Sequence, residues 1–276
     1  MPLPSRSYPR YCVMWIPERW ITTPTMPAIT LYTAATPNGF KLSIVLEELG
    51  LKYDVVPLSF AKNEQKSESY VKVNPNGRIP GILDKASPFG EYGLMESGAQ
   101  MVYLTDQYDK SHKLSFPHGS EEYYTMIQWL FFMNAGLGPM QGQANHFFRY
   151  APEKIPYGIN RYQTETRRLY SVMEARLTGR EWLAGDHISV ADIACYSWVR
   201  SGLWAGIDGW EEKYPNLKAW KERIDARPAV QRGLEVPSSD RAHLEAAKDP
   251  KKAEEIAKQN SAWVMKGMNE EAEKHK

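Results

Sequence analysis

The segment Thr36-Pro-Asn-Gly lies where an apolar alternating run gives way to an amphipathic helical pattern. Pro37 suits a turn or the first position of a helix, and Gly39 allows a ligand to approach the backbone closely. Asn38 is either a simple helix cap or a hydrogen-bond donor to that ligand. A helix N-terminus with an added donor favours a bound anion. The segment is therefore a candidate anion site.

A second candidate site is the sequence Met-Glu-Ser-Gly-Ala at residues 95–99, where a strand is expected to become a helix. The Ser97 hydroxyl and the first free backbone amides can hold a carboxylate there, with the helix dipole adding attraction. Glu96 can pair with an ammonium group. The alternative interpretation is that Ser97 only caps the helix.

A third feature is Pro80, which stands between Ile79 and Gly81 at the start of an expected strand. It marks either an edge strand or a cis turn. A cis bond would turn the N–H and C=O of Ile79 toward an extended peptide, which would pair as one more strand. A carboxylate receptor, an ammonium partner and a peptide-pairing strand together suit the γ-glutamyl end and backbone of glutathione.

Other kinds of chemistry lack their usual motifs in this sequence. It has no Gly-rich phosphate loop, Cys-x-x-Cys, His-Glu-x-x-His or Gly-x-Ser-x-Gly motif. Cys12 and Cys195 form no disulfide framework or metal site, so we expect no bound metal and no catalytic cysteine. His146 is a lone histidine in a helical pattern, and a packed or half-exposed role is expected for it.

The composition limits the binding partners and the cellular compartment that we expect. A formal charge of +1 over 276 residues gives no electrostatic footprint for nucleic acid or an anionic membrane. No apolar run reaches the length of a membrane span. We expect a cytoplasmic protein, although the basic, Pro-rich N-terminus leaves mitochondrial targeting open. Met26 is an alternative start.

The order of expected elements is β-α-β-(α)-β-β-α followed by helices. Strands are predicted at 28–33, 52–60, about 79–84 and 92–97, with a helix from the Thr36 segment to Leu49 that ends at Gly50. Residues 87–91 are expected to join the last two strands as a hairpin. Ser189 and Asp192 predict a capping box on a buried helix that carries Cys195.

The predicted domains follow from this order. Residues 1–25 form an extension, expected to be disordered, and 26–112 form a mixed α/β unit. Residues 119–237 form an all-helical unit, and 238–276 form a charged tail. One interpretation of this tail is a solvated helix that packs lightly through Trp263 or Met265.

From about Ile29 to Leu234 the chain resembles glutathione transferases. General marks are NPNGRIPGILD, MESGA and ISVADIACY. Narrower marks are TPNGFK, QWLFFMNAGLGPMQGQANHF and RYQTETRRLY, which are similar to the bacterial nu class and to the fungal family that includes the yeast nitrogen-catabolite regulator. The resemblance implies a thioredoxin-like N-terminal domain, an all-α glutathione-transferase C-terminal domain and a homodimer with its active sites beside the interface.

The resemblance also implies roles for individual residues. Asn38 and Thr36 would lie next to the glutathione sulfur, with the Asn38 amide as donor. The expected contacts to the rest of glutathione from the first domain are Gln65, Ile79, Glu96 and Ser97. Gln128 and Arg161 are the expected contacts from the helical domain, made either within one chain or across the dimer. For Arg161 the alternative is an exposed helix arginine paired with a nearby acid.

The expected activity is a glutathione-dependent transferase or oxidoreductase that reduces disulfides or peroxides, with weaker conjugation of electrophiles. Glutathione or glutathione disulfide and a small electrophile, disulfide or peroxide would be its partners. Alternatives are a glutathione transferase of secondary metabolism and a non-catalytic glutathione-binding regulator. Neither the N-terminal extension nor the tail is rich in Asn or Gln, so neither resembles the prion-forming segment of the yeast regulator.

Overall fold

The computed structural model describes residues 28–274, so the predicted extension at 1–25 and Cys12 lie outside the described part. Its first unit is built on a four-stranded sheet in the order β2-β1-β3-β4. The strands are β1 (Ile29–Thr33), β2 (Tyr53–Pro57), β3 (Gly81–Asp84) and β4 (Tyr92–Leu94). β1 runs parallel to β2 and antiparallel to β3, and β3 runs antiparallel to β4.

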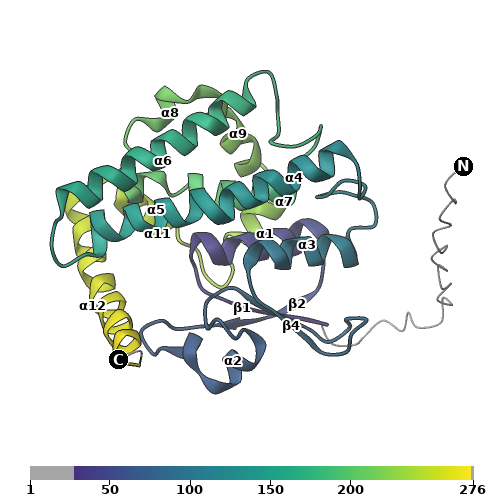
Figure 1. Cartoon of the computed structure of the whole chain (residues 1–276), viewed down its shortest axis with the longest axis horizontal. Coiled ribbons are helices and arrows are strands. Elements are labelled where there is room, and N and C mark those ends of the chain that lie inside the picture. Colours follow the sequence, from purple (N-terminus) through teal and green to yellow (C-terminus); the bar gives the residue numbers. More distant parts are fainter. Residues whose placement is uncertain (1–27, 275–276) are drawn as a thin grey trace, which may run out of the picture.

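Helices cover both faces of this sheet (Figure 1). α1 (Pro37–Leu49) and α3 (Ser97–Tyr108) lie on one side, and the short α2 (Glu68–Val73), preceded by η1 (Glu64–Lys66), lies on the other. α1 begins where the Thr36 side chain accepts the Gly39 N–H, and it ends at Gly50, whose φ of 67° is the left-handed conformation that favours glycine. The first unit is thus the predicted α/β layer, and the predicted end of its first helix is confirmed.

Two strands are shorter than the sequence predicts. The strand expected at 52–60 ends at Pro57. Leu58 makes one further hydrogen bond to the sheet, from its N–H to Thr33 O. The chain then turns, and the Ser59 N–H donates to the Glu64 carboxylate. The strand expected at 92–97 ends at Leu94 because Glu96 has a φ of 64° and α3 starts at Ser97. The antiparallel pairing of β3 with β4 confirms the hairpin through 87–91.

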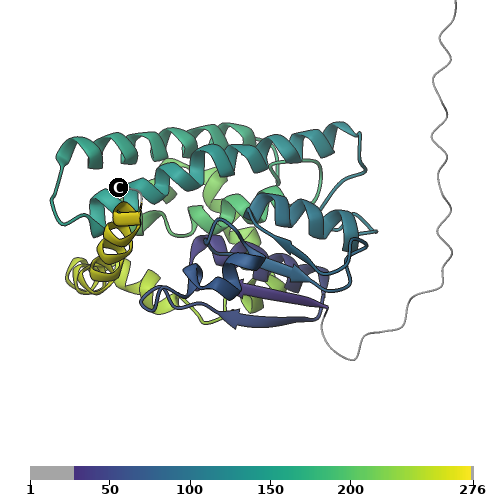
Figure 2. The same cartoon turned by 60° about the horizontal axis from the view of Figure 1, so that its bottom comes forward.

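The second unit is helical, as predicted, and its long helices lie side by side above the first unit in both views (Figures 1 and 2). In chain order its elements are α4 (Glu121–Phe132), η2 (Met133–Leu137), α5 (Gly138–Asn145), η3 (His146–Tyr150), α6 (Pro156–Leu177), α7 (Val190–Val199), η4 (Gly202–Ala205), α8 (Trp210–Lys213), α9 (Pro215–Asp225) and α10 (Pro228–Gly233). Two of them, η2 and η3, are π-helical. The chain then continues through α11 (Arg241–Ala247) and α12 (Pro250–Lys274).

α7 is the centre of the helical core, and all ten of its residues are buried. The predicted capping box is present at its start: the Asp192 carboxylate accepts the Ser189 N–H and hydroxyl. The other oxygen of Asp192 accepts the Leu183 N–H and the Trp220 indole N–H. Four donors therefore satisfy one buried carboxylate, and this network fixes the helix that carries Cys195.

The two units meet along α1, which packs against α7 and α10. The Ser43 hydroxyl donates to Gly233 O at 2.7 Å, and a Cβ added at Gly233 would lie 2.7 Å from Ile44 Cα, so the two backbones touch. The buried Glu48 carboxylate accepts two hydrogen bonds from Arg227, at 2.6 and 2.9 Å. These contacts tie the N-terminal unit to the far end of the helical unit.

α12 follows the helical unit and runs along one edge of the molecule toward the loop between β2 and α2 (Figure 1). It packs through the buried Ala253 and Ala257, in a small apolar cluster with Trp204, and the Ser261 hydroxyl donates to Tyr150 O. Trp263 stacks on Phe60. Among residues 28–274 no helix is both long and apolar enough to cross a membrane.

We predict that Arg227→Met lowers the free energy of unfolding by about 3 kcal/mol, because it leaves the buried Glu48 carboxylate without its bidentate partner. The matched control is Arg232→Met, which removes the more exposed pair with Glu47 and should cost under about 1 kcal/mol. Urea unfolding of both variants measures the difference. Equal losses would contradict the assignment of the Glu48 pair as the stronger link.

Candidate active site

A cavity of about 1050 Å³ lies between the two units and α12. Its walls include the start of α1, the loop after β2, the loop before β3, the start of α3, the η2–α5 region and the C-terminal half of α12. Six of the eight predicted site residues line it: Thr36, Asn38, Gln65, Ile79, Glu96 and Ser97. The fold thus brings together residues that are up to 61 positions apart in the chain.

At the start of α1, Thr36 and Asn38 have different functions. Thr36 is the N-cap, with its hydroxyl oxygen accepting the Gly39 N–H at 3.2 Å. Asn38 is therefore not the cap, which was the alternative to its role as donor. A Cβ added at Gly39 would lie 2.1 Å from Ala34 O, so glycine is required for the chain to turn this tightly into the helix.

The side chain of Asn38 is held in one orientation. Its Oδ1 accepts the Lys41 ammonium at 2.9 Å and the Trp198 indole N–H at 3.2 Å. Because an indole nitrogen can only donate, the atom between these two groups is the amide oxygen. The Nδ2 group is left to point elsewhere, and within the described part of the chain it has no hydrogen-bond partner. Asn38 is half-buried at the cavity wall and can donate to an anion there.

Lys41 is a buried cation at the centre of the site. Its side chain is almost fully enclosed, and Nζ lies 2.9 Å from Asn38 Oδ1, 3.3 Å from Ser97 Oγ and 2.9 Å from Met133 Sδ. Desolvation lowers the pKa of Lys41 from 10.5 to about 7, against the attraction of Cys195 and Glu96. An anion bound near Nζ would favour the charged form of this lysine.

The loop before β3 presents one residue with unused backbone groups. The carbonyl of Arg78 accepts the Tyr70 hydroxyl and the Asn74 amide, and the carbonyl of Pro80 accepts the Gln100 amide at 2.9 Å. Ile79 lies between them, and its N–H and C=O have no partner among residues 28–274. The Ile79–Pro80 peptide bond is cis. An extended peptide can pair with Ile79, as the sequence suggested.

The start of α3 forms the carboxylate end of the site. Glu96 precedes the helix with a φ of 64°, and its side chain does not cap the helix. The first amides of α3 and the Ser97 hydroxyl therefore remain available to an anion. The exposed Glu96 carboxylate, which Asn76 contacts at 3.4 Å, adds a negative group beside them. An amino acid with its ammonium on Glu96 and its carboxylate on Ser97 matches this arrangement.

Gln65 has a buried oxygen that lacks a partner. Its Nε2 donates to Asn63 Oδ1 at 2.7 Å, while Oε1 is enclosed without a hydrogen bond. Leaving a buried carbonyl oxygen unsatisfied is costly, so a donor supplied by a ligand would stabilise it. A peptide ligand with N–H groups fits this position.

The remaining two predicted residues lie away from this cavity. Gln128 is exposed on α4, and Arg161 is exposed on α6, where it lines a separate cavity with Tyr157 and Glu165. The prediction assigned them to the helical domain and left open that they act across a dimer. In a single chain they do not reach the ligand pocket.

Several residues of the pocket were not predicted from sequence. Lys41 and Trp198 contact Asn38, and Met133 contacts Lys41. The tail supplies Trp263, Val264 and Met268 to the wall. Lys41 is the lysine of the TPNGFK motif. Its position three residues after Asn38, one helical turn away, was the available signal.

Other groups are unsuited to catalysis. Cys195 is enclosed in α7, and burial raises the pKa of its thiol, so it is not poised as a thiolate. His146 lies outside the cavity lining, and desolvation lowers its pKa. Residues 28–274 contain no group of three or more His, Cys, Asp or Glu side chains arranged to hold a metal ion.

Comparison with known proteins agrees with this geometry. Residues 27–106 match the family model "Glutathione S-transferase, N-terminal domain", and residues 157–228 match "Glutathione S-transferase, C-terminal domain". Disulfide-bond oxidoreductase YfcG of Escherichia coli is 42% identical over 208 residues, which cover 75% of this chain and 94% of that protein.

Solved structures give the same result. A glutathione transferase homolog from Lodderomyces elongisporus, crystallised with two GSH per subunit, is 46% identical with a TM-score of 0.73, and the match covers 77% of this chain and 100% of that one. The glutathione transferase URE2P6 from Phanerochaete chrysosporium, in complex with oxidized glutathione, is 41% identical with a TM-score of 0.73, covering 79% and 98%. The predicted fold class and the predicted likeness to this branch of proteins are confirmed.

We predict that the burial of Lys41 makes stability depend on pH. The unfolded chain keeps the usual lysine pKa of 10.5, whereas in the fold it is about 7. Between pH 7 and pH 10.5 the unfolded state binds more protons at Lys41 than the folded state does. The folding stability that depends on Lys41 is therefore complete above about pH 10.5, and it is lost as the pH falls to 7. The lost stability accumulates at no more than about 1.4 kcal/mol per pH unit.

Lys41→Met should remove this dependence, so its free energy of unfolding relative to the parent should rise as pH falls from 10 to 7. Urea unfolding at several pH values measures the difference. Lys218→Met, which changes a half-exposed lysine on α9, is the control and should follow the parent. A Lys41→Met curve parallel to the parent would show that Lys41 keeps an ordinary pKa.

Proposed function

Because the chain belongs to the glutathione transferase family, we propose that it uses glutathione thiolate to reduce disulfides or peroxides, with weaker conjugation of electrophiles. The observation that carries the proposal is the fixed amide of Asn38, which offers its N–H at the N-terminus of α1. The name of the YfcG relative, a disulfide-bond oxidoreductase, supports disulfides as acceptors.

Glutathione fits the cavity as an extended tripeptide. Its γ-glutamyl ammonium would bind Glu96, and the carboxylate beside it would bind Ser97 and the first amides of α3. Its cysteinyl backbone would pair with the free N–H and C=O of Ile79. The buried Gln65 oxygen would accept a peptide N–H. With these groups placed, the sulfur lies toward Asn38 and Thr36.

The task of the protein is to keep the sulfur ionised. A free thiol has a pKa of roughly 8.5, so at neutral pH most of it is protonated. The Asn38 N–H, the Thr36 hydroxyl, the dipole of α1 and the nearby Lys41 charge all favour the anion. The thiolate attacks one sulfur of a disulfide, forms a mixed disulfide and releases the other sulfur as a thiolate. No protein cysteine is needed.

Lys41 acts on this step through Asn38 and Ser97. Its ammonium group contacts both side chains, one at the sulfur end of the ligand and one at the γ-glutamyl end. Two bound anionic groups would raise the pKa of Lys41 above its value of about 7 in the free protein. Lys41 is thus a positioning residue whose charge is favoured when glutathione is present.

A turnover panel tests the activity. With glutathione present, we expect reduction of hydroxyethyl disulfide and of an organic peroxide, and slower conjugation of an aryl halide. The parent protein and Cys195→Ala should behave alike, since the buried thiol has no part in the chemistry. Conjugation of the aryl halide as the dominant activity would favour a dedicated transferase. Binding of glutathione with no turnover would favour a regulator.

We predict that Asn38→Ala lowers turnover at least about ten-fold, the effect of losing one charge-assisted hydrogen bond of roughly 1.5–3 kcal/mol. The apparent thiol pKa of bound glutathione should rise, whereas glutathione affinity should fall less because Glu96, Ser97 and Ile79 remain. Ultraviolet titration of bound glutathione and steady-state kinetics measure both. Asn269→Ala, an exposed position on α12 outside the cavity lining, is the control. An Asn38→Ala variant with the parental pKa and turnover would rule out this role.

We also propose a homodimer in which Gln128 and Arg161 contribute to the site of the partner subunit. Both are exposed and neither lines the pocket of its own chain. α4 also exposes Tyr124 and Phe131, which are large apolar groups suited to an interface. Sedimentation at micromolar concentration should show a dimer, and Phe131→Glu should weaken it. Sedimentation of the parent as a monomer alone would contradict the proposal.

A further inference from the structure

Gln100 lies on α3, one helical turn after Ser97, and its side chain is fully buried. Its Nε2 group donates to two backbone carbonyls, Pro80 O at 2.9 Å and Leu94 O at 2.8 Å. Because both partners are acceptors, the atom that faces them is the amide nitrogen, which carries two hydrogens. Asn74 also donates to Pro80 O, at 3.3 Å. The Gln100 side chain therefore joins the end of β4 to the loop before β3.

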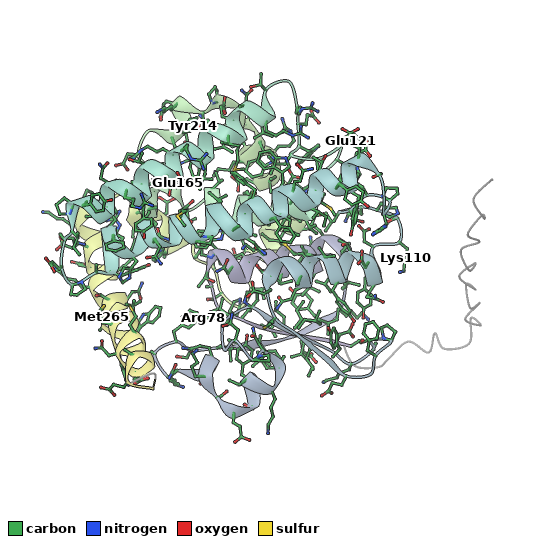
Figure 3. All side chains as sticks on the ribbon, viewed as in Figure 1. Arg78, Lys110, Glu121, Glu165, Tyr214 and Met265 are labelled. Carbon is green, nitrogen blue, oxygen red and sulfur yellow. The ribbon has the colours of Figure 1, made fainter. Side chains whose placement is uncertain are left out.

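The two carbonyls lie where two strands of the sheet separate. At this end of the ladder the last pair of β3 and β4 is Ile82 with Leu94, and Pro80 has no N–H with which to continue it. From here β3 leads back into the loop that Figure 3 marks by Arg78, and β4 leads forward into α3. The Gln100 amide thus supplies donors at the point where the ladder bonds stop.

The two separating segments carry the two halves of the proposed peptide receptor. One presents Ile79, which is proposed to pair with the cysteinyl backbone of glutathione, and the other presents Glu96 and Ser97, which are proposed to bind its γ-glutamyl group. A ligand of fixed covalent length binds both halves best when their spacing is already correct. The Gln100 amide holds both segments, so it controls that spacing.

Glu96 has a strained backbone, because its φ of 64° is the left-handed conformation that favours glycine. Such a conformation persists where contacts hold the chain on both sides of it. Gln100 holds both sides, since its side chain donates to Leu94 O and its main-chain N–H donates to Glu96 O at 2.9 Å. Gln100 therefore also fixes the direction of the carboxylate that is proposed to bind the ammonium group.

The same amide leaves one atom unsatisfied. Its Oε1 is buried and has no hydrogen-bond partner in the described part of the chain. An unsatisfied buried oxygen costs stability and offsets part of what the two hydrogen bonds of Nε2 contribute. Stability alone is thus a weak reason for an amide at this position, and the alignment of two carbonyls is a stronger one.

We infer that Gln100 is a positioning residue for glutathione, which sets the spacing between the groups that bind its cysteinyl and γ-glutamyl parts. Gln100 does not line the cavity and acts through the backbone of its neighbours. The inference rests on the proposed function, because the spacing matters only to a ligand that binds both groups. Affinity for glutathione then depends on a buried amide that the ligand does not touch.

Calorimetry with S-methylglutathione and the full chain tests this inference without turnover. Gln100→Met keeps the length of the side chain and removes both donors, so the dissociation constant should rise about ten-fold over that of the parent. Gln100→Asn keeps an amide that is one methylene shorter and cannot span both carbonyls. A rise of about three-fold is expected for this second variant.

Steady-state kinetics give a second measurement. In Gln100→Met the KM for glutathione should rise about ten-fold, whereas kcat and the KM for hydroxyethyl disulfide should stay within about two-fold, because Asn38 and α1 are unchanged. Thr105→Val is the matched control on the same helix. Its buried hydroxyl donates to Met101 O and Val102 O within α3, so its loss should leave glutathione affinity at the parental value.

The outcomes separate this inference from the proposed function. A folded Gln100→Met variant with the parental dissociation constant would overturn the inference and leave the proposed function intact. An equal loss of affinity in Thr105→Val would also overturn it, because any loosening of α3 would then weaken binding. Failure of both Gln100 variants to fold, measured by circular dichroism, would assign the amide to the fold alone and contradict the inference. A parent that does not bind S-methylglutathione would overturn the proposed function itself, and the inference with it.

Discussion

The candidate active site depends on one buried amine, that of Lys41. Lys41 comes from α1, Ser97 from the start of α3 and Met133 from the start of η2, and the last two meet Lys41 Nζ together with Asn38. Enclosing an amine costs stability, as the lowered pKa of this lysine shows, and the hydrogen bonds only partly offset that cost. The fold retains this buried lysine at the point where an anionic ligand would supply the missing negative charge. Through this single atom the lysine joins the start of α1, the start of α3 and the helical unit, which are the places proposed for the glutathione sulfur and its γ-glutamyl group.

α1 gives this arrangement its rigidity. One face of the helix lies on the sheet, another packs against α3, and its remaining surface meets α7 and α10 of the helical unit. Its residues from Gly39 to Leu46 are all buried. A helix enclosed on all sides cannot rotate without opening close-packed contacts, so its N-terminal amides and Asn38 keep a fixed direction. The indole of Trp198, fixed in the buried α7, holds the other side of the same amide.

Local chemistry explains which parts were predictable from the sequence. Thr36 and Gly50 bound α1, Ser189 and Asp192 begin α7, and the hairpin at 87–91 follows from turn residues, so short-range patterns were enough to place these elements. The resemblance to glutathione transferases then grouped Asn38, Ile79 and Ser97, which the fold brings to one cavity. Lys41 was missed because a lysine in an amphipathic helix is expected on the solvent face. Trp198 was missed because its contact with Asn38 spans 160 residues and leaves no periodic trace.

The C-terminal tail, residues 238–276, shows most clearly that contacts between distant parts of the chain cannot be predicted from local sequence patterns. Its charges are balanced and its apolar residues are few, so the sequence indicates a helix on the surface and says nothing of what that helix covers. The docking position comes from small residues, since Ala253 and Ala257 allow close packing while Trp263 reaches Phe60. Once seated, α12 touches the helical unit through Ser261 and the β2–α2 loop through Glu270. That loop also carries Gln65, so α12 borders the part of the cavity where a peptide N–H is proposed to bind. α12 therefore closes one side of the cavity, while the start of α1 with Thr36 and Asn38 forms another.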